Sequence, residues 1–317
     1  MAPARELSGR APGGMWWVAW RQHRTLVLAG LGLMALVAVA MVVFRLIYDA
    51  HPPGGPGFHA DDAFWRVLRL SLLVLPVGLG ALGGATVVGS ERERGTILFA
   101  FSQGVSRSRW YWTCCAVVVP PLTLGVLGLA LVDQWVATAP GLEPWGPMAI
   151  PDFQITGTVP AILTLIAFGV GVPAGALVRS LAAAMSLAVI VAGIITITLG
   201  FGAYVDLVPA ERTLAPPTEN SQVTPRGSYL VGLGYLDAAG QSAAAPACPS
   251  RPDPLDPAVD TPAPWNQCLA QAGIVASYWD YLTTQSRLRL TVTLAAIAAV
   301  IAAAGLSLGW WMVSRRL

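Results

Sequence analysis

Six long runs of uncharged, apolar residues limit what this chain can fold into. Each run has about 20 residues or more, enough for an α-helix to cross a hydrocarbon core roughly 30 Å thick. Only 11% of the 317 residues are charged and 55% are hydrophobic, whereas about 25% are charged in a typical soluble domain. The runs are Thr25–Phe44, Leu70–Gly89, Trp110–Val132, Thr158–Val178, Leu181–Val205 and Leu290–Val313. The sequence therefore predicts an all-α membrane protein with six transmembrane helices.

The placement of arginine predicts the orientation of these helices, because basic residues accumulate in short cytoplasmic segments. With the N-terminus inside, those segments contain Arg5, Arg10, Arg21, Arg24, Arg92, Arg94, Arg107, Arg109, Arg179, Arg315 and Arg316. Most acidic residues fall on the opposite side, where Arg45, Arg66 and Arg69 also lie. We expect a multi-pass protein of the cell (plasma) membrane with both termini in the cytoplasm.

The segments outside the runs divide the chain further. Residues 1–24 form a cytoplasmic tail that ends in "MWWVAWRQHR", where Trp16 and Trp20 share a helix face beside Arg21 and Arg24. This pattern is typical of an interfacial helix in the headgroup layer, although an aromatic belt at the start of the first span would use the same residues. Residues 25–205 contain five spans, and residues 290–317 contain the sixth span and a cytoplasmic end.

Residues 206–289 form a large external loop or cap. Many prolines and few long apolar runs argue against a folded enzyme domain there. Cys248 and Cys268 lie on the oxidising side in this topology, so we expect a disulfide, with two unpaired thiols as the alternative. We expect the closing stretch "IVASYWDYL" to be a short amphipathic helix on the outer membrane surface.

Three further patterns are weaker. Gly80 with Gly84, and Gly171 with Gly175, have the GxxxG spacing that lets helices approach closely in lipid. His51 and His59, near Asp61 and Asp62, have no fixed ligand spacing, so we expect no metal site. Cys114 and Cys115 are expected to be small packing residues.

The segment "SERERGTILFAFSQGVSRSRW" lies between the second and third runs and carries four arginines and two glutamates. Ser90 and Glu93 have capping-box spacing, and Thr96 and Gly104 can begin and end a short helix. Its apolar face would consist of Ile97, Leu98, Phe101 and Val105. A solvated positive loop explains the arginines, but a surface presented to a cytoplasmic partner also explains the glutamates and the apolar helix.

This segment resembles the cytoplasmic coupling element between the second and third spans of permease subunits in type-2 ABC exporters. The matching residues are Glu91, Glu93, Gly95, Thr96, Ser106, Arg107, Arg109 and Trp110. The string "WVAWRQHR" is also similar to the N-terminal amphipathic helix of actinobacterial members. Cys114 stands where a lysine is common in the family.

The resemblance implies a coupling helix in segment 90–109 that contacts a separate ABC ATPase subunit. The residues expected to couple the two subunits are Glu91, Glu93, Gly95, Thr96, Leu98, Phe101, Arg107 and Arg109. It also implies a second permease copy or a paralogue as a partner. This chain would bind no cofactor, and ATP and Mg would lie on the ATPase.

The residues themselves agree with an external energy supply. None of the six runs contains the ionisable residue that a proton relay needs, and the chain has no G-x-x-x-x-G-K-[ST] phosphate loop. We therefore expect a permease subunit that exports a hydrophobic or amphipathic cargo and is not itself an enzyme. The alternative is a non-transporting sensor or assembly protein with an extracellular ligand-binding segment. A membrane enzyme is less favoured, because no cluster of catalytic residues converges, and we expect no nucleic-acid partner.

Overall fold

The structure is a computed structural model, and it describes residues 13–50, 63–95, 105–139, 148, 151–202, 207–216, 228–244, 246, 248 and 263–315. Six helices in these ranges are long and apolar enough to cross a membrane. They are α1 (Gly13–Ala50), α2 (Ala63–Arg94), α4 (Arg107–Val136), α6 (Val159–Leu177), α7 (Leu181–Ile197, continued by the π-helix η1, Thr198–Gly202) and α9 (Ser286–Arg315). The prediction of an all-α membrane protein with six transmembrane helices is confirmed in its six membrane-length helices, and the protein is mostly helical.

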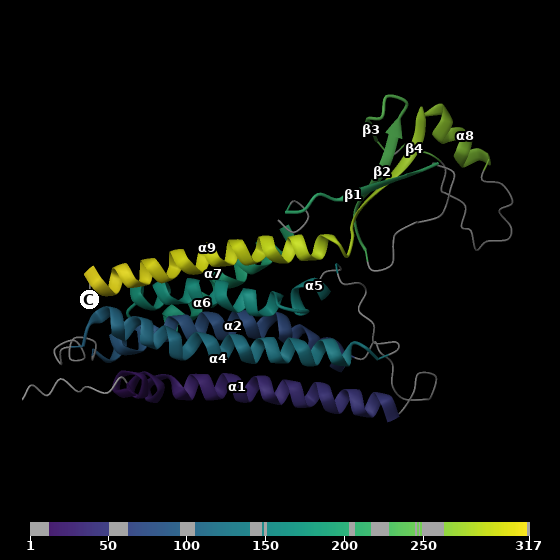
Figure 1. Cartoon of the computed structure of the whole chain (residues 1–317). Helices are drawn as coiled ribbons and strands as arrows, with labels where there is room; N and C mark the ends of the chain where they lie inside the picture. Colours follow the sequence, from purple (N-terminus) through teal and green to yellow (C-terminus); the bar gives the residue numbers. More distant parts are fainter. Residues whose placement is uncertain are drawn as a thin grey trace, which may run out of the picture. The chain divides into compact units, whose positions relative to one another are not determined.

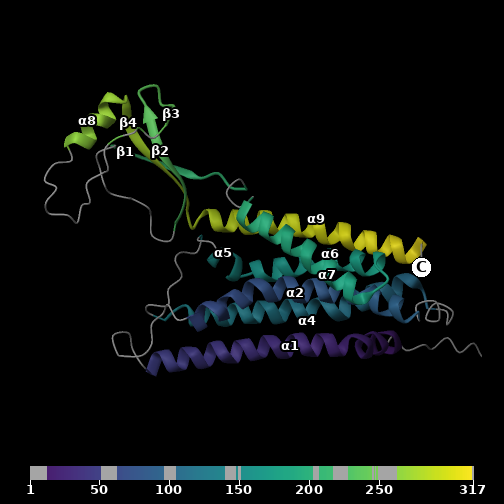
Figure 2. The ribbon, with the colours of Figure 1, turned by 180° about the vertical axis from the view of Figure 1, so that it is seen from behind.

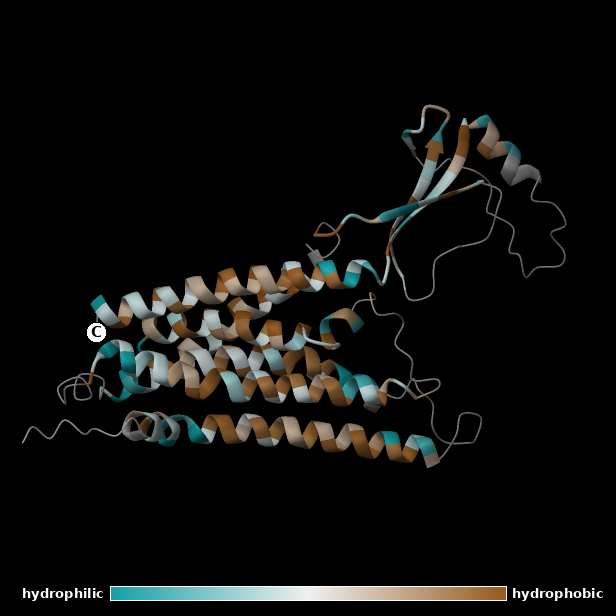
Figure 3. Cartoon of the chain, viewed as in Figure 1, coloured by the Kyte–Doolittle hydropathy of each residue, from teal (hydrophilic) through white to brown (hydrophobic). Residues whose placement is uncertain are grey.

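The six helices run side by side, with the beginning of α1 and the end of α9 at the same end of the bundle (Figures 1 and 2). The last turn of α2 and the first turn of α4 lie at this end too, which we call the Glu91 end. We call the opposite end, where α4 finishes, the Asp133 end. Apolar residues occupy the middle of the helices and polar residues gather near their ends (Figure 3), as membrane-spanning helices require.

Glycines allow a close helix crossing between α2 and α6. An ideal Cβ on Gly84 would lie 3.0 Å from the Cα of Gly171 and would collide with the carbonyl oxygen of Phe168. A Cβ on Gly175 would likewise collide with the backbone of Ala85. Gly84 and Gly171 therefore face each other, and both GxxxG pairs lie at this crossing, in keeping with the compact bundle that they suggested.

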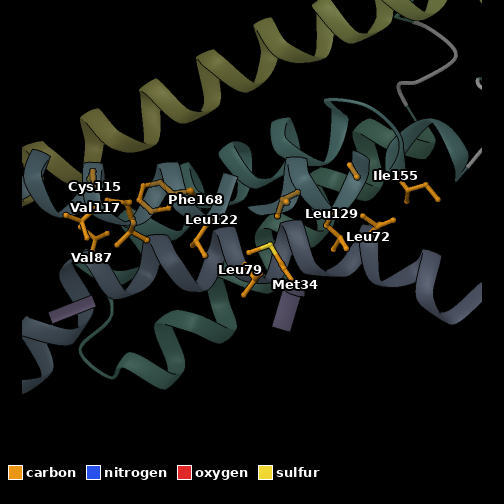
Figure 4. Packing of buried hydrophobic residues seen from close by; sticks show 14 of the residues in the cluster. Met34, Leu72, Leu79, Val87, Cys115, Val117, Leu122, Leu129, Ile155 and Phe168 are labelled. Carbon is orange, nitrogen blue, oxygen red and sulfur yellow. The ribbon is translucent and has the colours of Figure 1, made fainter. Parts of the chain in front are cut away.

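Large side chains fill the remaining space between α1, α2, α4 and α6. Met34, Leu79, Leu122 and Phe168 pack together in this core (Figure 4). Cys114 and Cys115 are buried free thiols in α4, as expected of packing residues. The helix α9 is tied to α4 by the Tyr111 hydroxyl, which donates a hydrogen bond of 2.7 Å to the carbonyl oxygen of Leu306.

A second compact unit comprises Trp145–Asp152 and Ala203–Leu290. It contains a four-stranded antiparallel sheet in the order β1-β4-β2-β3. The strands are β1 (Glu211–Ala215), β2 (Tyr229–Asp237), β3 (Ser242–Ala243) and β4 (Ile274–Leu282), with the helix α8 (Ala263–Gln271) preceding β4. A disulfide joins Cys248 to Cys268, with their Cα atoms 5.8 Å apart, so this prediction is confirmed.

The expectation of an amphipathic helix at "IVASYWDYL" is wrong, because these residues form the central strand β4. Trp279 pairs with Thr213 of β1 on one side and with Leu233 of β2 on the other. Valine, tyrosine and tryptophan favour strands, and cross-strand pairs stabilise them. A short apolar-aromatic stretch carries little periodic signal of its own, and the neighbouring strands decide its conformation.

Candidate functional site

The structure describes both flanks of segment 90–109, namely residues 90–95 and 105–109. Thr96, Leu98 and Phe101 lie outside the described residues, as does the rest of the predicted coupling helix. The flanks alone therefore define the site. They comprise the last turn of α2, with Gly95, and the first turn of α4, with its N-cap.

Three consecutive residues at the end of α2 each contact a different helix. The Gln22 side-chain amide of α1 donates a hydrogen bond of 2.5 Å to Oε1 of Glu91. The Arg92 guanidinium donates to the carbonyl oxygen of Ala176, near the end of α6. Oε1 of Glu93 accepts a hydrogen bond of 3.3 Å from the backbone N–H of Leu181, the first residue of α7.

Two of these contacts suit the electrostatics of helix ends. The last carbonyl groups of α6 lack partners within their own helix and carry partial negative charge, which the Arg92 cation complements. The first N–H groups of α7 carry partial positive charge, which the Glu93 carboxylate complements. Arg92 and Glu93 thus hold the two sides of the tight turn between α6 and α7.

Gly95 ends α2 in a left-handed conformation. Its φ is +67°, and its N–H donates a hydrogen bond of 3.2 Å to the carbonyl oxygen of Arg92. No heavy atom lies within 4 Å of an ideal Cβ at this position. Glycine is therefore favoured here by the backbone conformation and not by lack of space.

At the start of α4, too, a charged side chain bonds to the backbone at the end of another helix. Ser106 caps α4, because its Oγ accepts a hydrogen bond of 3.3 Å from the backbone N–H of Arg109. The Arg107 guanidinium donates hydrogen bonds of 2.8 Å to the carbonyl oxygen of Ser314 and 3.4 Å to that of Val313, in the last turn of α9. The Arg109 side chain is exposed, whereas Trp110 is buried.

We call Glu91, Arg92, Glu93 and Arg107 the clamp. Together these side chains reach α1, α6, α7 and α9 from the two flanks of residues 96–104. These four side chains therefore join the two flanks to helices that are far apart in the sequence. Sequence reasoning singled out Glu91, Glu93 and Arg107 but not Arg92 as a contact residue, and no spacing in the sequence indicated their backbone partners.

The predicted interfacial residues lie on the first turns of α1, which continues without interruption into the first span. Trp16, Trp20, Arg21 and Arg24 are all exposed. These first turns are seen almost along the helix axis in Figures 1 and 2, whereas the rest of α1 is seen from the side, so the helix bends near its N-terminus. The position of these turns in the headgroup layer stays a prediction.

The Asp133 end contains a buried ion pair that sequence reasoning missed. Asp133 of α4 is 0% exposed, and its Oδ1 lies 3.4 Å from Nε of Arg69 in α2. Nearby, Arg45 of α1 pairs with Asp49 at 2.8 Å and donates a hydrogen bond of 3.0 Å to the carbonyl oxygen of Val136. The sequence feature that could have indicated this ion pair is the presence of arginines on the side of the membrane where acidic residues predominate.

Among the described residues, no group of three or more His, Cys, Asp or Glu side chains could hold a metal ion.

The six long apolar helices define a multi-pass membrane protein. Residues 57–203 match the family model described as ABC-2 membrane transporter related. This stretch includes segment 90–109 and the helices from α2 to α7. Together with the six helices, the match supports a membrane permease of an ABC transporter. No curated protein and no solved structure matches the chain.

Proposed function

We propose that this chain is the permease subunit of an ATP-driven exporter and that a separate ABC ATPase docks on segment 90–109. The observation that carries the proposal is the clamp, which ties both flanks of that segment to four other helices. The family match over residues 57–203 supports the same assignment. In this proposal Thr96, Leu98 and Phe101 provide the surface for the ATPase, and Arg109 adds a charged contact beside it.

Movement of the ATPase would reach the spans through the clamp. Glu91 would carry the movement to α1, Arg92 and Glu93 to the turn between α6 and α7, and Arg107 to the end of α9. Because α2 and α6 meet backbone to backbone at Gly84 and Gly171, they would move together. Such a unit can rock as a rigid body and open a path, as packed helices do in other transporters.

The proposal includes the expected partners and location. A second permease copy or a paralogue would supply the other half of the path, and ATP and Mg would bind the ATPase alone. The chain would be a transport subunit of the plasma membrane without enzymatic activity of its own, with both termini in the cytoplasm. Its cargo would be hydrophobic or amphipathic, in keeping with the apolar spans.

Purification in mild detergent from the native membrane tests this proposal. We expect a stoichiometric ATPase partner and vanadate-sensitive ATP hydrolysis. Glu93→Arg places a cation at the N-terminus of α7, and Phe101→Asp places a charge on the expected docking face, so either variant should lose the partner. Arg315→Glu is the matched charge reversal outside the clamp and should keep it. A folded preparation without any nucleotide-hydrolysing partner would overturn the proposal.

One observation favours a second function, that of a sensor or assembly protein with an extracellular ligand-binding segment. The unit containing Ala203–Leu290 has a four-stranded sheet and a disulfide, and is thus more than a simple connecting loop. Under this alternative, the purified chain would bind a ligand through the sheet and would not associate with an ATPase. The same purification therefore separates the two functions.

A further inference from the structure

The first turns of α1 present arginine and tryptophan on one exposed face. Trp17, Arg21 and Arg24 are spaced by four and three residues, so they lie on the same side of the helix. Trp17 is 58% exposed, and the Arg21 guanidinium lies over its ring, 5.3 Å from the centroid. Leu28, one turn beyond Arg24, is 56% exposed and begins the apolar part of the span.

This combination fits the headgroup of an anionic phospholipid. A guanidinium group binds phosphate oxygens through two parallel hydrogen bonds. Tryptophan settles at the level of the headgroups, with its apolar ring toward the acyl chains. Trp16 and Trp20 are exposed on the same turns. An acidic protein surface would satisfy the arginines but would leave this group of indole rings and the adjoining Leu28 without apolar cover.

The opposite side of the same turns faces the bundle. Ala19 and His23 are 1% and 2% exposed. Between Arg21 and His23, Gln22 donates its hydrogen bond to Glu91 of the clamp. Residues that are adjacent in the sequence are therefore exposed on one side of the helix and contact the clamp on the other.

We propose that Arg21 and Arg24 bind an anionic phospholipid headgroup and that the bond between Gln22 and Glu91 links this lipid to the clamp. The lipid would hold the first turns of α1 in place, and these turns would in turn fix the carboxylate at the end of α2. The binding site stands on the exposed face of α1 alone. Its effect on ATP hydrolysis rests on the proposed function.

Lipid retention tests the binding site without any ATPase. The chain is purified in mild detergent, exposed to phosphatidylglycerol or phosphatidylcholine, and examined by native mass spectrometry. We expect selective retention of phosphatidylglycerol. Because each basic residue beside an anionic surface is worth about fivefold in binding, Arg21→Gln with Arg24→Gln should reduce retention by about 25-fold. The matched pair Arg179→Gln with Arg315→Gln removes two exposed arginines close in sequence to Leu181 and Ser314, which contact the clamp, and this variant should retain the lipid. Excess inorganic phosphate should not displace it.

The link to the clamp is tested in nanodiscs containing the permease and its ATPase. ATP hydrolysis should depend on phosphatidylglycerol in the unaltered complex. Gln22→Leu should remove this dependence while lipid retention stays the same, which a merely misfolded variant would not do.

Equal lipid retention by the Arg21→Gln, Arg24→Gln variant would overturn the site. Loss of the ATPase from that variant with normal lipid retention would also overturn it, by assigning the face to a protein partner. If no ATPase copurifies at all, the proposed function fails, and the retention experiment still decides the lipid site.

Discussion

The two ends of the helix bundle use charge in different ways. At the Glu91 end, Arg92, Glu93 and Arg107 bond to the backbone atoms of other helix ends. At the Asp133 end, Arg69 and Asp133 bond to each other, with the carboxylate fully buried and the arginine side chain 15% exposed. A charge beside an exposed helix end typically contributes about 0.3–1 kcal/mol, whereas breaking a buried ion pair costs roughly 3–5 kcal/mol.

Because of this difference, the two ends suit different roles: one stabilises the bundle, and the other can transmit movement. The Asp133 end joins α2 to α4 by an ion pair. Breaking this pair has a high free-energy cost, because a single charge would then remain in a poorly solvated position. The clamp at the Glu91 end consists of weaker contacts, and one of its two carboxylates, Glu93, is exposed. We infer that the Asp133 end holds the bundle together while the Glu91 end can respond to a partner.

The largest expected effect comes from breaking the buried ion pair. Asp133→Ala removes the carboxylate that Arg69 bonds, and should lower the free energy of unfolding by about 3–5 kcal/mol. Asp49→Ala, which removes the exposed partner of Arg45, should cost less than about 1 kcal/mol. Thermal unfolding of both variants in the same detergent measures the difference. Equal melting temperatures would contradict the assignment of stability to the Asp133 end.

A smaller effect is expected from a side chain placed at the helix crossing between the two ends. Gly84→Val would collide with the backbone of α6 and should destabilise the bundle by about 1–3 kcal/mol. Gly78→Val is the matched control in the same helix, because no heavy atom lies within 4 Å of its ideal Cβ. Thermal unfolding again provides the measurement. If both substitutions were tolerated alike, α2 and α6 would not form one rigid unit.

Loss of one clamp residue should have a local effect of about 1 kcal/mol. Arg107→Gln removes the cation that bonds the last turn of α9, so amide hydrogen exchange should become faster there. Exchange at the Asp133 end of the bundle should not change. Arg109→Gln alters an exposed neighbour and should leave the exchange of α9 as it was. Uniformly faster exchange throughout the bundle would mean that the clamp also carries global stability.

The smallest effect is expected from the exposed ion pair of the sheet. Arg212 donates hydrogen bonds of 2.7 and 2.8 Å to the carboxylate of Asp280, which lowers the pKa of Asp280. Because the folded pKa lies below the unfolded value of about 3.9, the stabilisation is present above that pH and is lost as the pH falls through the folded pKa. The stabilisation contributed by this pair should therefore be constant above about pH 5 and should decline slightly below about pH 4.

Arg212→Gln should remove the contribution of Asp280 to this acid dependence. The measurement compares the stability of the unaltered protein and of the variant as a function of pH. A change in stability between pH 6 and 8 that disappears in Arg212→Gln would show that a group other than Asp280 controls the ion pair.

Much of the candidate site could be predicted from the sequence, although its contacts could not. The glutamates and arginines of segment 90–109 stood out against long uncharged runs, and the resemblance assigned them to coupling. The bond between Glu93 and Leu181 joins residues 88 positions apart, and that between Arg107 and Ser314 joins residues 207 positions apart. Such pairs depend on which helix ends meet in space, and no local pattern encodes that.

The sequence by itself determined the features that depend on local composition. Hydrophobic length determined the six spans, and glycine spacing indicated helices that can pack closely, although not which ones. Two cysteines in the segment between the last two spans indicated the disulfide. Each feature follows from the chemistry of a short stretch, whatever the rest of the chain does.

Only the tertiary structure decided the features that depend on distant neighbours. The residues of β4 became a strand because β1 and β2 supply hydrogen bonds on both of its sides. Asp133 is buried because α2 brings Arg69 to it, and not because its own helix requires an acid there. The clamp acquired its partners in the same way, since a charged side chain finds a helix end only after the helices have packed.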